Sequence, residues 1–145
     1  MAQRIKVTLA TDDLVLLQGV LLDAQGDPSR FPPESERRER LDRWLRRLDE
    51  QIARRGQEVR LTEADWDVLD ACLGRRAGRL RADARALFDT VVAGSPRDPA
   101  SQARLQAAAE AALAELDRID GLVQQFRDRL TRELGRPPRR PWILR

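Results

Sequence analysis

Hydrophobic residues recur at helical spacing along most of the chain. The longest such pattern follows Asp98-Pro99, where a capping residue and a proline predict the start of a helix that ends at Gly135. Over four heptads the a and d positions are apolar, namely Leu105, Ala109, Ala112, Leu116, Ile119, Val123, Phe126 and Leu130. A ladder of this kind is buried only when a second long helix lies along it.

A second long helix is predicted between Thr62 and Gly94. The segment from Thr62 to Asp65 has the form of a capping box, and an apolar stripe follows it. The stripe consists of Trp66, Leu69, Leu73, Leu80, Leu87, Phe88 and Val91. Gly74 and Gly78 interrupt this helix, and we expect a kink or the close approach of a neighbouring helix there. The two long helices predict an antiparallel hairpin.

Two shorter helices are predicted earlier in the chain. One runs over 14–24 with Thr11 as its N-cap, and it is apolar on most sides, which favours a place in the centre of a bundle. The other opens at Phe31-Pro32-Pro33 and ends before Gly56. Its polar face mixes arginines with acids at helical spacing, as is typical of a solvated, ion-paired surface.

Two short segments, 4–9 and 58–61, alternate in the manner of β-strands. They and the helices after them match at an offset of 52 residues, as with Val7 and Val59. One interpretation is that any strand followed by a capped helix looks alike, and the other is a duplicated unit whose strands pair as a ribbon. The fold class is therefore mainly all-α: residues 1–135 form a helical bundle with a long hairpin and room for a minor two-stranded ribbon.

No family is recognised in these residues. The opening strand and helix are faintly similar to a ribbon–helix–helix DNA-binding module, in which strands of two chains pair and enter the major groove. The chain departs from that module because its first helix is apolar all round and because a long helical hairpin follows.

Charge is abundant but balanced. Charged residues make up 35% of the chain, and Lys6 is the only lysine beside many arginines. The pI of about 10.2 arises because the chain has no histidine and almost nothing titrates between its carboxylates and its arginines. Residues 136–145, a proline-rich tail, carry four arginines and no acid, which leaves the preceding body close to neutral. Residues 1–135 are therefore not strongly basic.

The residue types on which most enzymes depend are missing. Without histidine or tyrosine, the chain has neither a Ser–His nor a Cys–His nucleophile system, and its glycines form no phosphate loop. Catalysis would have to come from carboxylates alone. Pairs three residues apart, as in Mg²⁺-dependent nucleotide hydrolases, are Glu36 with Glu39, Asp67 with Asp70 and Asp117 with Asp120. These acids lie among arginines or beside the apolar stripes, so we expect no catalytic residue, metal site or cofactor.

Cys72 is the single cysteine, which excludes an internal disulfide. Its apolar neighbours predict a buried small side chain rather than a redox sensor. Charges interrupt the N-terminal segment before any signal-like run, and no stretch approaches eighteen apolar residues. We therefore expect a cytoplasmic protein with no membrane partner.

Two arginine groups are candidate contact sites. The first, with the nearby Arg85, lies on the third helix, and the second lies in the tail. The candidate residues are Arg75, Arg76, Arg79 and Arg81 on the helix, and Arg136, Arg139, Arg140 and Trp142 in the tail. The helix group predicts either phosphate contacts with nucleic acid or ion pairs with acids of a neighbouring helix. The tail is expected to be extended and to dock on its own bundle, on another subunit or on a partner.

The sequence thus predicts a non-enzymatic helical interaction protein: an adaptor, regulator or assembly subunit. Its third and fourth helices are expected to mediate self-association, in the manner of a coiled coil and most simply as a dimer. The alternatives are a nucleic-acid-associated subunit that uses the arginine groups and a carboxylate–Mg²⁺ nucleotide hydrolase.

Overall fold

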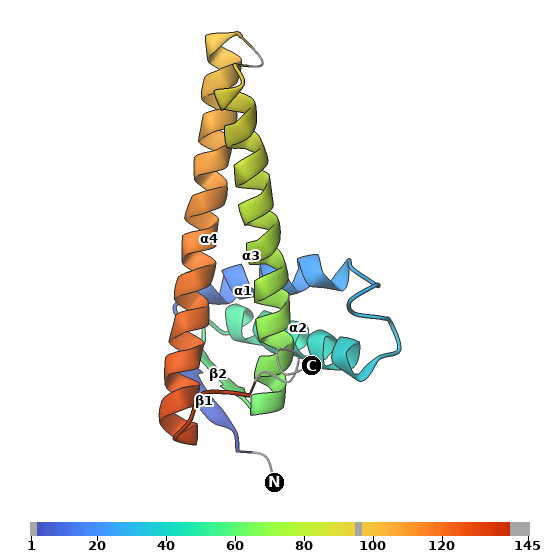
Figure 1. Cartoon of the computed structure of the whole chain (residues 1–145). Coiled ribbons are helices and arrows are strands. Elements are labelled where there is room, and N and C mark those ends of the chain that lie inside the picture. The colour runs from blue at the N-terminus through green and yellow to red at the C-terminus, as the bar shows by residue number, and fades with distance from the viewer. Residues whose placement is uncertain (1–2, 95–96, 140–145) are drawn as a thin grey trace.

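The computed structural model describes residues 3–94 and 97–139. Its elements, in chain order, are β1 (Ile5–Thr8), α1 (Thr11–Gln25), α2 (Glu36–Ala53), β2 (Glu58–Leu61), α3 (Glu63–Val92) and α4 (Pro99–Leu134). Helices α3 and α4 form a tall antiparallel hairpin, while α1, α2 and the two strands lie beside its lower half (Figure 1). The predicted fold, mainly helical with a minor two-stranded ribbon, is confirmed.

The predicted pairing of the two strands as a ribbon is confirmed. Strands β1 and β2 pair antiparallel, and Val7 lies opposite Val59, its match at the 52-residue offset. The flanking partners are Ile5 with Leu61 and Leu9 with Gln57. The duplication of a strand–helix unit stays a prediction, because any two antiparallel strands pair in this way.

Helix α4 covers the outer edge of β1. The side-chain amide of Gln125 donates to the carbonyl oxygen of Thr8 at 2.9 Å, and Nε of Arg129 donates to the carbonyl oxygen of Lys6 at 3.0 Å. These contacts satisfy carbonyls that would otherwise offer an edge for pairing with another strand. The lower part of α4 is thereby joined to the ribbon.

The predicted starts of the two long helices are confirmed. In the capping box of α3, the Thr62 hydroxyl accepts from the Asp65 N–H at 3.1 Å, and the Asp65 carboxylate accepts from the Thr62 N–H at 2.9 Å. At α4 the Asp98 carboxylate accepts from the Ser101 N–H at 3.1 Å. A left-handed Gly135 ends α4.

The predicted starts of the two shorter helices were wrong. Helix α2 begins at Glu36 because the Ser35 hydroxyl caps it, accepting from the Arg38 N–H at 3.1 Å. The prolines that follow Phe31 lie in the preceding turn. At α1, Ala10 occupies the N-cap position and Thr11 is already helical, so the helix begins without a side-chain cap.

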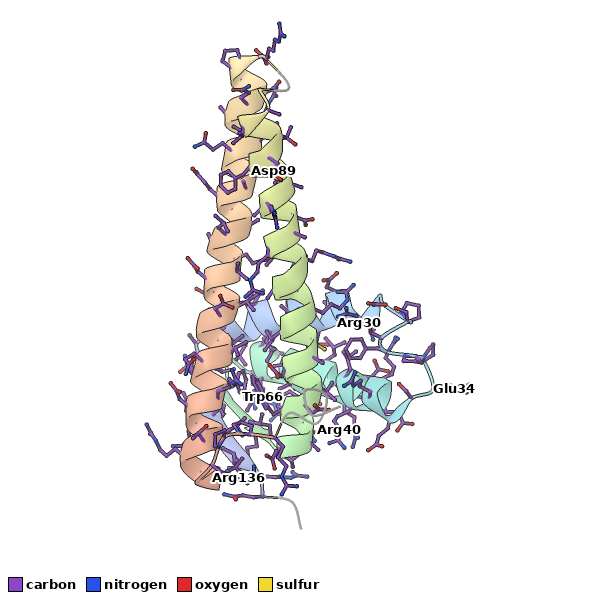
Figure 2. The ribbon with its side chains drawn as sticks, in the orientation of Figure 1. Arg30, Glu34, Arg40, Trp66, Asp89 and Arg136 are labelled. Carbon is purple, nitrogen blue, oxygen red and sulfur yellow. The ribbon has the colours of Figure 1, made fainter. Side chains whose placement is uncertain are left out.

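One continuous core fills the lower half of the molecule. It joins the inner face of the ribbon to all four helices, and at its centre Trp66 and Phe126 stack with their ring centroids 5.2 Å apart. Figure 2 shows Trp66 inside this lower half. The expected central place of α1 is only partly correct, because Val15 is 49% and Leu22 53% exposed.

Two smaller features complete the fold. A methyl group added at Gly74 or Gly78 would meet no other atom within 4 Å, so the expected close approach of a neighbouring helix is wrong. Within the described residues, no helix combines the length and the apolar character needed to cross a membrane.

We predict that Trp66→Ala lowers the free energy of unfolding by about 3–5 kcal/mol, because it removes a large, fully buried side chain from the centre of the core. Denaturant titration measures this loss. Arg60→Ala, on the exposed face of the ribbon, is the control and should change stability by less than about 0.5 kcal/mol. A loss below about 1 kcal/mol for Trp66→Ala would contradict its place as a core anchor.

Candidate functional site

The upper part of the hairpin extends beyond the core. The last core residue on α3 is Leu80, and the first on α4 is Leu116. Above them, in residues 84–94 and 97–114, the only buried side chains are Ala84 and Ala109, and neither belongs to the main core cluster. We call these residues the distal hairpin. Asp89, labelled in Figure 2, marks how far it rises above the other elements.

Large apolar side chains of the distal hairpin remain in contact with solvent. Val92 is 86% exposed and Leu113 39% exposed. The half-exposed apolar residues are Leu87, Phe88, Val91 and Leu105. Two helices alone cover only the facing stripe of each other, so the flanks of this stripe stay open where no third element packs against them.

The distal hairpin is also poor in charge. About one residue in five is charged there, against 35% in the whole chain. The charges are three arginines and three acids: Arg85, Arg97, Arg104, Asp89, Asp98 and Glu110. Alanine is the most frequent residue. The part of the hairpin that projects beyond the core is therefore neutral in charge and rich in alanine.

The predicted arginine group of α3 lies lower, where α1 crosses the hairpin. Nε of Arg75 lies 2.8 Å from the Asp27 carboxylate, and its Nη1 lies 2.9 Å from the Asp23 carboxylate. Arg79 contacts the other oxygen of Asp23 at 3.2 Å. Hydrogen bonds from Ser29 and then from Arg75 hold the pKa of Asp27 well below its usual range. These ion pairs join the end of α1 to α3.

The remaining members of this group face α4. Arg76 pairs with Glu115 at 2.8 Å, and Arg81 lies 3.7 Å from Asp120. Of the two interpretations of the helix group, the structure therefore favours pairing with acids of neighbouring helices. Arg85 forms no ion pair within the described residues.

The described part of the tail docks on its own bundle. The Arg136 guanidinium binds the Glu63 carboxylate with two hydrogen bonds of 2.7 and 2.8 Å. The Arg139 backbone N–H donates to the same carboxylate at 2.7 Å, and Pro138 is buried. The tail thus ties the end of α4 to the start of α3. Arg140 and Trp142, the other predicted tail residues, lie outside the described residues.

A groove of about 580 Å³ lies between the starts of α2 and α3 and the tail. Its lining carries both acidic and basic side chains. Glu36, from one of the predicted carboxylate pairs, is 3.4 Å from Arg40, and Asp67, from another, is 3.7 Å from Arg37. In the described part of the chain, no group of three or more acids or cysteines is placed to hold a metal ion. Opposite charges therefore pair along this groove, both within α2 and between α2 and α3.

Cys72 is fully buried among the apolar residues of the core. Burial raises the pKa of its thiol to about 12, so the thiolate does not form near neutral pH.

Comparison of the chain with protein-family models, with curated proteins and with solved structures finds no match.

The exposed side of α1 was not predicted from the sequence. Val15 and Leu22 lie seven residues apart and so share one face of the helix. The whole helix was expected in the centre of the bundle, because nothing in the local pattern separates an exposed valine from a buried one in a helix that is apolar on most sides. The signal available was the low amphipathicity of this helix, which leaves its buried face undefined.

We predict that Arg136→Ala raises the pKa of Glu63 from about 2 towards its ordinary value of 4.5, because Arg136 is the largest cause of the depression. Carboxyl NMR titration measures this shift. Since the folded-state pKa is depressed, the contact stabilises the fold above about pH 4.5, and this contribution is lost as the pH falls towards 2. Arg132→Ala, on the last turn of α4, is the control. An unchanged Glu63 pKa in Arg136→Ala would show that the tail does not make this contact in solution.

Proposed function

We propose that this chain is a non-enzymatic helical interaction protein of the cytoplasm, an adaptor, regulator or assembly subunit, that self-associates through its distal hairpin. The observation that carries the proposal is the projection of α3 and α4 beyond the core with Val92 and Leu113 exposed.

The energetics support a binding role for this segment. A short pair of helices with almost no core is marginal in water, because most helical stability comes from tertiary packing. Burial of apolar surface contributes roughly 25 cal/mol per Å², so covering the flanks of the distal hairpin would stabilise both the helices and the complex. Val92 and Leu113 would leave water in such a complex, as exposed apolar side chains at interaction sites do.

The charge pattern supports a second copy as the partner. A self-complementary interface places the same patch against itself, so a patch with strong net charge would repel its own copy. The distal hairpin carries equal numbers of arginines and acids. Its neutral, alanine-rich surface can approach an identical surface closely without charge repulsion.

The nucleic-acid alternative receives less support. The carboxylates of Asp23, Asp27 and Glu115 neutralise arginines that would have to contact phosphates, and Glu63 neutralises Arg136. Among the described aromatic side chains, Phe88 of the distal hairpin is half-exposed and the others, Phe31, Trp44, Trp66 and Phe126, are buried, so no fully exposed platform for bases accompanies these arginines. For the hydrolase alternative, the three predicted carboxylate pairs do not converge on one site in the described residues.

We predict that the protein self-associates in sedimentation equilibrium and that Val92→Glu with Leu113→Glu weakens this association by roughly tenfold or more. Both side chains are exposed, so the double variant should keep its helical content and thermal stability. Ala53→Glu with Gln57→Glu, two exposed positions at and just after the end of α2, adds the same two negative charges outside the proposed surface and is the matched control. A wild-type protein that stays monomeric at all accessible concentrations would overturn the proposal.

A separate measurement tests the nucleic-acid alternative. We predict no detectable binding to a generic DNA duplex or RNA at about 50 mM salt, where nonspecific electrostatic affinity is strong. Binding that weakens steeply with added salt would instead revive this alternative. In that case, deletion of residues 136–145 would distinguish binding by the tail from binding by α3.

A further inference from the structure

The groove between the starts of α2 and α3 begins where the described part of the tail stops. Glu63, on the first turn of α3, binds the Arg136 guanidinium and the backbone N–H of Arg139. Arg139 also lines the groove itself. Because Arg140 is covalently joined to Arg139, residues 140–145 start at the mouth of this groove.

The floor of the groove is apolar and lacks a large side chain. Ala64 and Val68 lie one turn apart on α3 and line the groove between the charged side chains of its rim. Ala64 is exposed, and among the described lining residues no apolar side chain is larger than that of Val68. A volume of about 580 Å³ therefore stands open over a small apolar floor.

One polar atom of the groove lacks a hydrogen-bond donor. Oδ1 of Asp67 is buried and accepts no hydrogen bond from the described residues. Oδ2 of the same carboxylate lies 3.7 Å from Arg37, which is an ion pair but is too long for a hydrogen bond. A buried acceptor without a donor costs free energy, and in native proteins nearly all such atoms have a partner. A donor that enters the groove would satisfy this atom.

Residues 140–145 have the chemistry that this groove lacks. Trp142, Ile143 and Leu144 are consecutive large apolar residues, whose burial removes apolar surface from water. The indole N–H of Trp142 and the guanidinium of Arg140 are hydrogen-bond donors. One short segment thus offers both an apolar side chain for the floor and a donor for the unpaired carboxylate oxygen.

We infer that residues 140–145 fold back into this groove of their own chain, with the Trp142 side chain on Ala64 and Val68 and a donor of the segment bonded to Asp67. The tail is then the ligand of the groove, and it closes the groove to other molecules. This inference goes beyond the self-association proposed above and does not depend on it.

The segment is long enough to reach these residues. Three residues of extended chain, from Arg139 to Trp142, span about 10 Å. Asp67 lies one turn of α3 beyond Glu63, which is a rise of about 6 Å. Trp142 can therefore reach the groove floor while Glu63 still holds the start of the tail.

Fluorine NMR of the full-length protein labelled with 5-fluorotryptophan tests the inference. The chain has three tryptophans, and Trp142→Phe assigns the signal of Trp142. The signal of an exposed indole shifts between H2O and D2O, whereas that of a shielded indole does not. We expect Trp142 to behave like Trp44 and Trp66, which are buried, and unlike a labelled peptide of residues 136–145. The full solvent shift of the peptide would overturn the inference.

A variant of the groove floor shows where Trp142 is shielded. We expect Ala64→Arg, which places a long charged side chain on the exposed part of the floor, to raise the solvent shift of Trp142 towards that of the peptide. Ala82→Arg, an exposed position of the same helix outside the groove, is the matched control and should leave the shift unchanged. Circular dichroism confirms that both variants are folded. Unchanged shielding in Ala64→Arg would place Trp142 elsewhere and contradict the inference.

Disulfide cross-linking separates binding within one chain from binding between copies. In the full-length chain with Ala64→Cys and Ile143→Cys, we expect an intramolecular disulfide on mild oxidation. Ala82→Cys with Ile143→Cys should give much less, because residue 82 lies about 27 Å further along α3. Cys72 is fully buried, and the single variants are the controls for its reactivity. A disulfide between copies in a mixture of the two single variants, with none within the double variant, would show that the tail binds a second copy and would overturn the inference.

Discussion

The α3–α4 hairpin is longer than the core around it, and the rest of the structure depends on this difference in length. Below Leu80 and Leu116, each helix of the pair packs against the other and against a further layer made of α1, α2 or the ribbon. Above these residues the pair continues alone, and a helix that packs against one neighbour can bury only one stripe. In the base, the apolar faces of the hairpin are therefore covered by a second layer. In the distal hairpin, no second layer of the described residues covers the apolar flanks of the two helices.

The ribbon fixes the lower ends of both helices of the hairpin. Its two strands pair around Val7 and Val59, so the helices that follow them, α1 and α3, leave the same small sheet and pack together. Helix α4 returns along the outer edge of β1 and is fixed there through Gln125 and Arg129. The lower end of the hairpin is consequently anchored on both of its helices, whereas no other element of the described residues packs against its upper end.

The sequence could predict the features that depend on nearby residues. The capping box at Thr62, the Asp98 cap and the alternation of the strands are local, and all of them appear in the structure.

Features set by distant residues were not predictable. Asp23 pairs with Arg75 and Arg79 across more than fifty positions, and nothing near Asp23 identifies its partners. The exposed face of α1 escaped prediction for the same reason, since the side of an apolar helix that is buried depends on what packs against it. For the candidate site, the ladder from Leu105 to Leu130 predicted the hairpin of α3 and α4, but not the height at which that ladder leaves the core.

The arginines that resemble a nucleic-acid patch in the sequence have a structural role that bears on binding. Asp23 and Asp27 hold Arg75 between them, and side chains that are largely buried and paired in this way restrict the angle between α1 and α3. That angle determines how the exposed face of α1 and the distal hairpin are oriented relative to each other. A binding surface that is fixed before association loses less conformational entropy on binding than a mobile one. In the self-association that we propose, the ion pairs between α1 and α3 contribute without touching the partner, because they fix the base from which the distal hairpin projects.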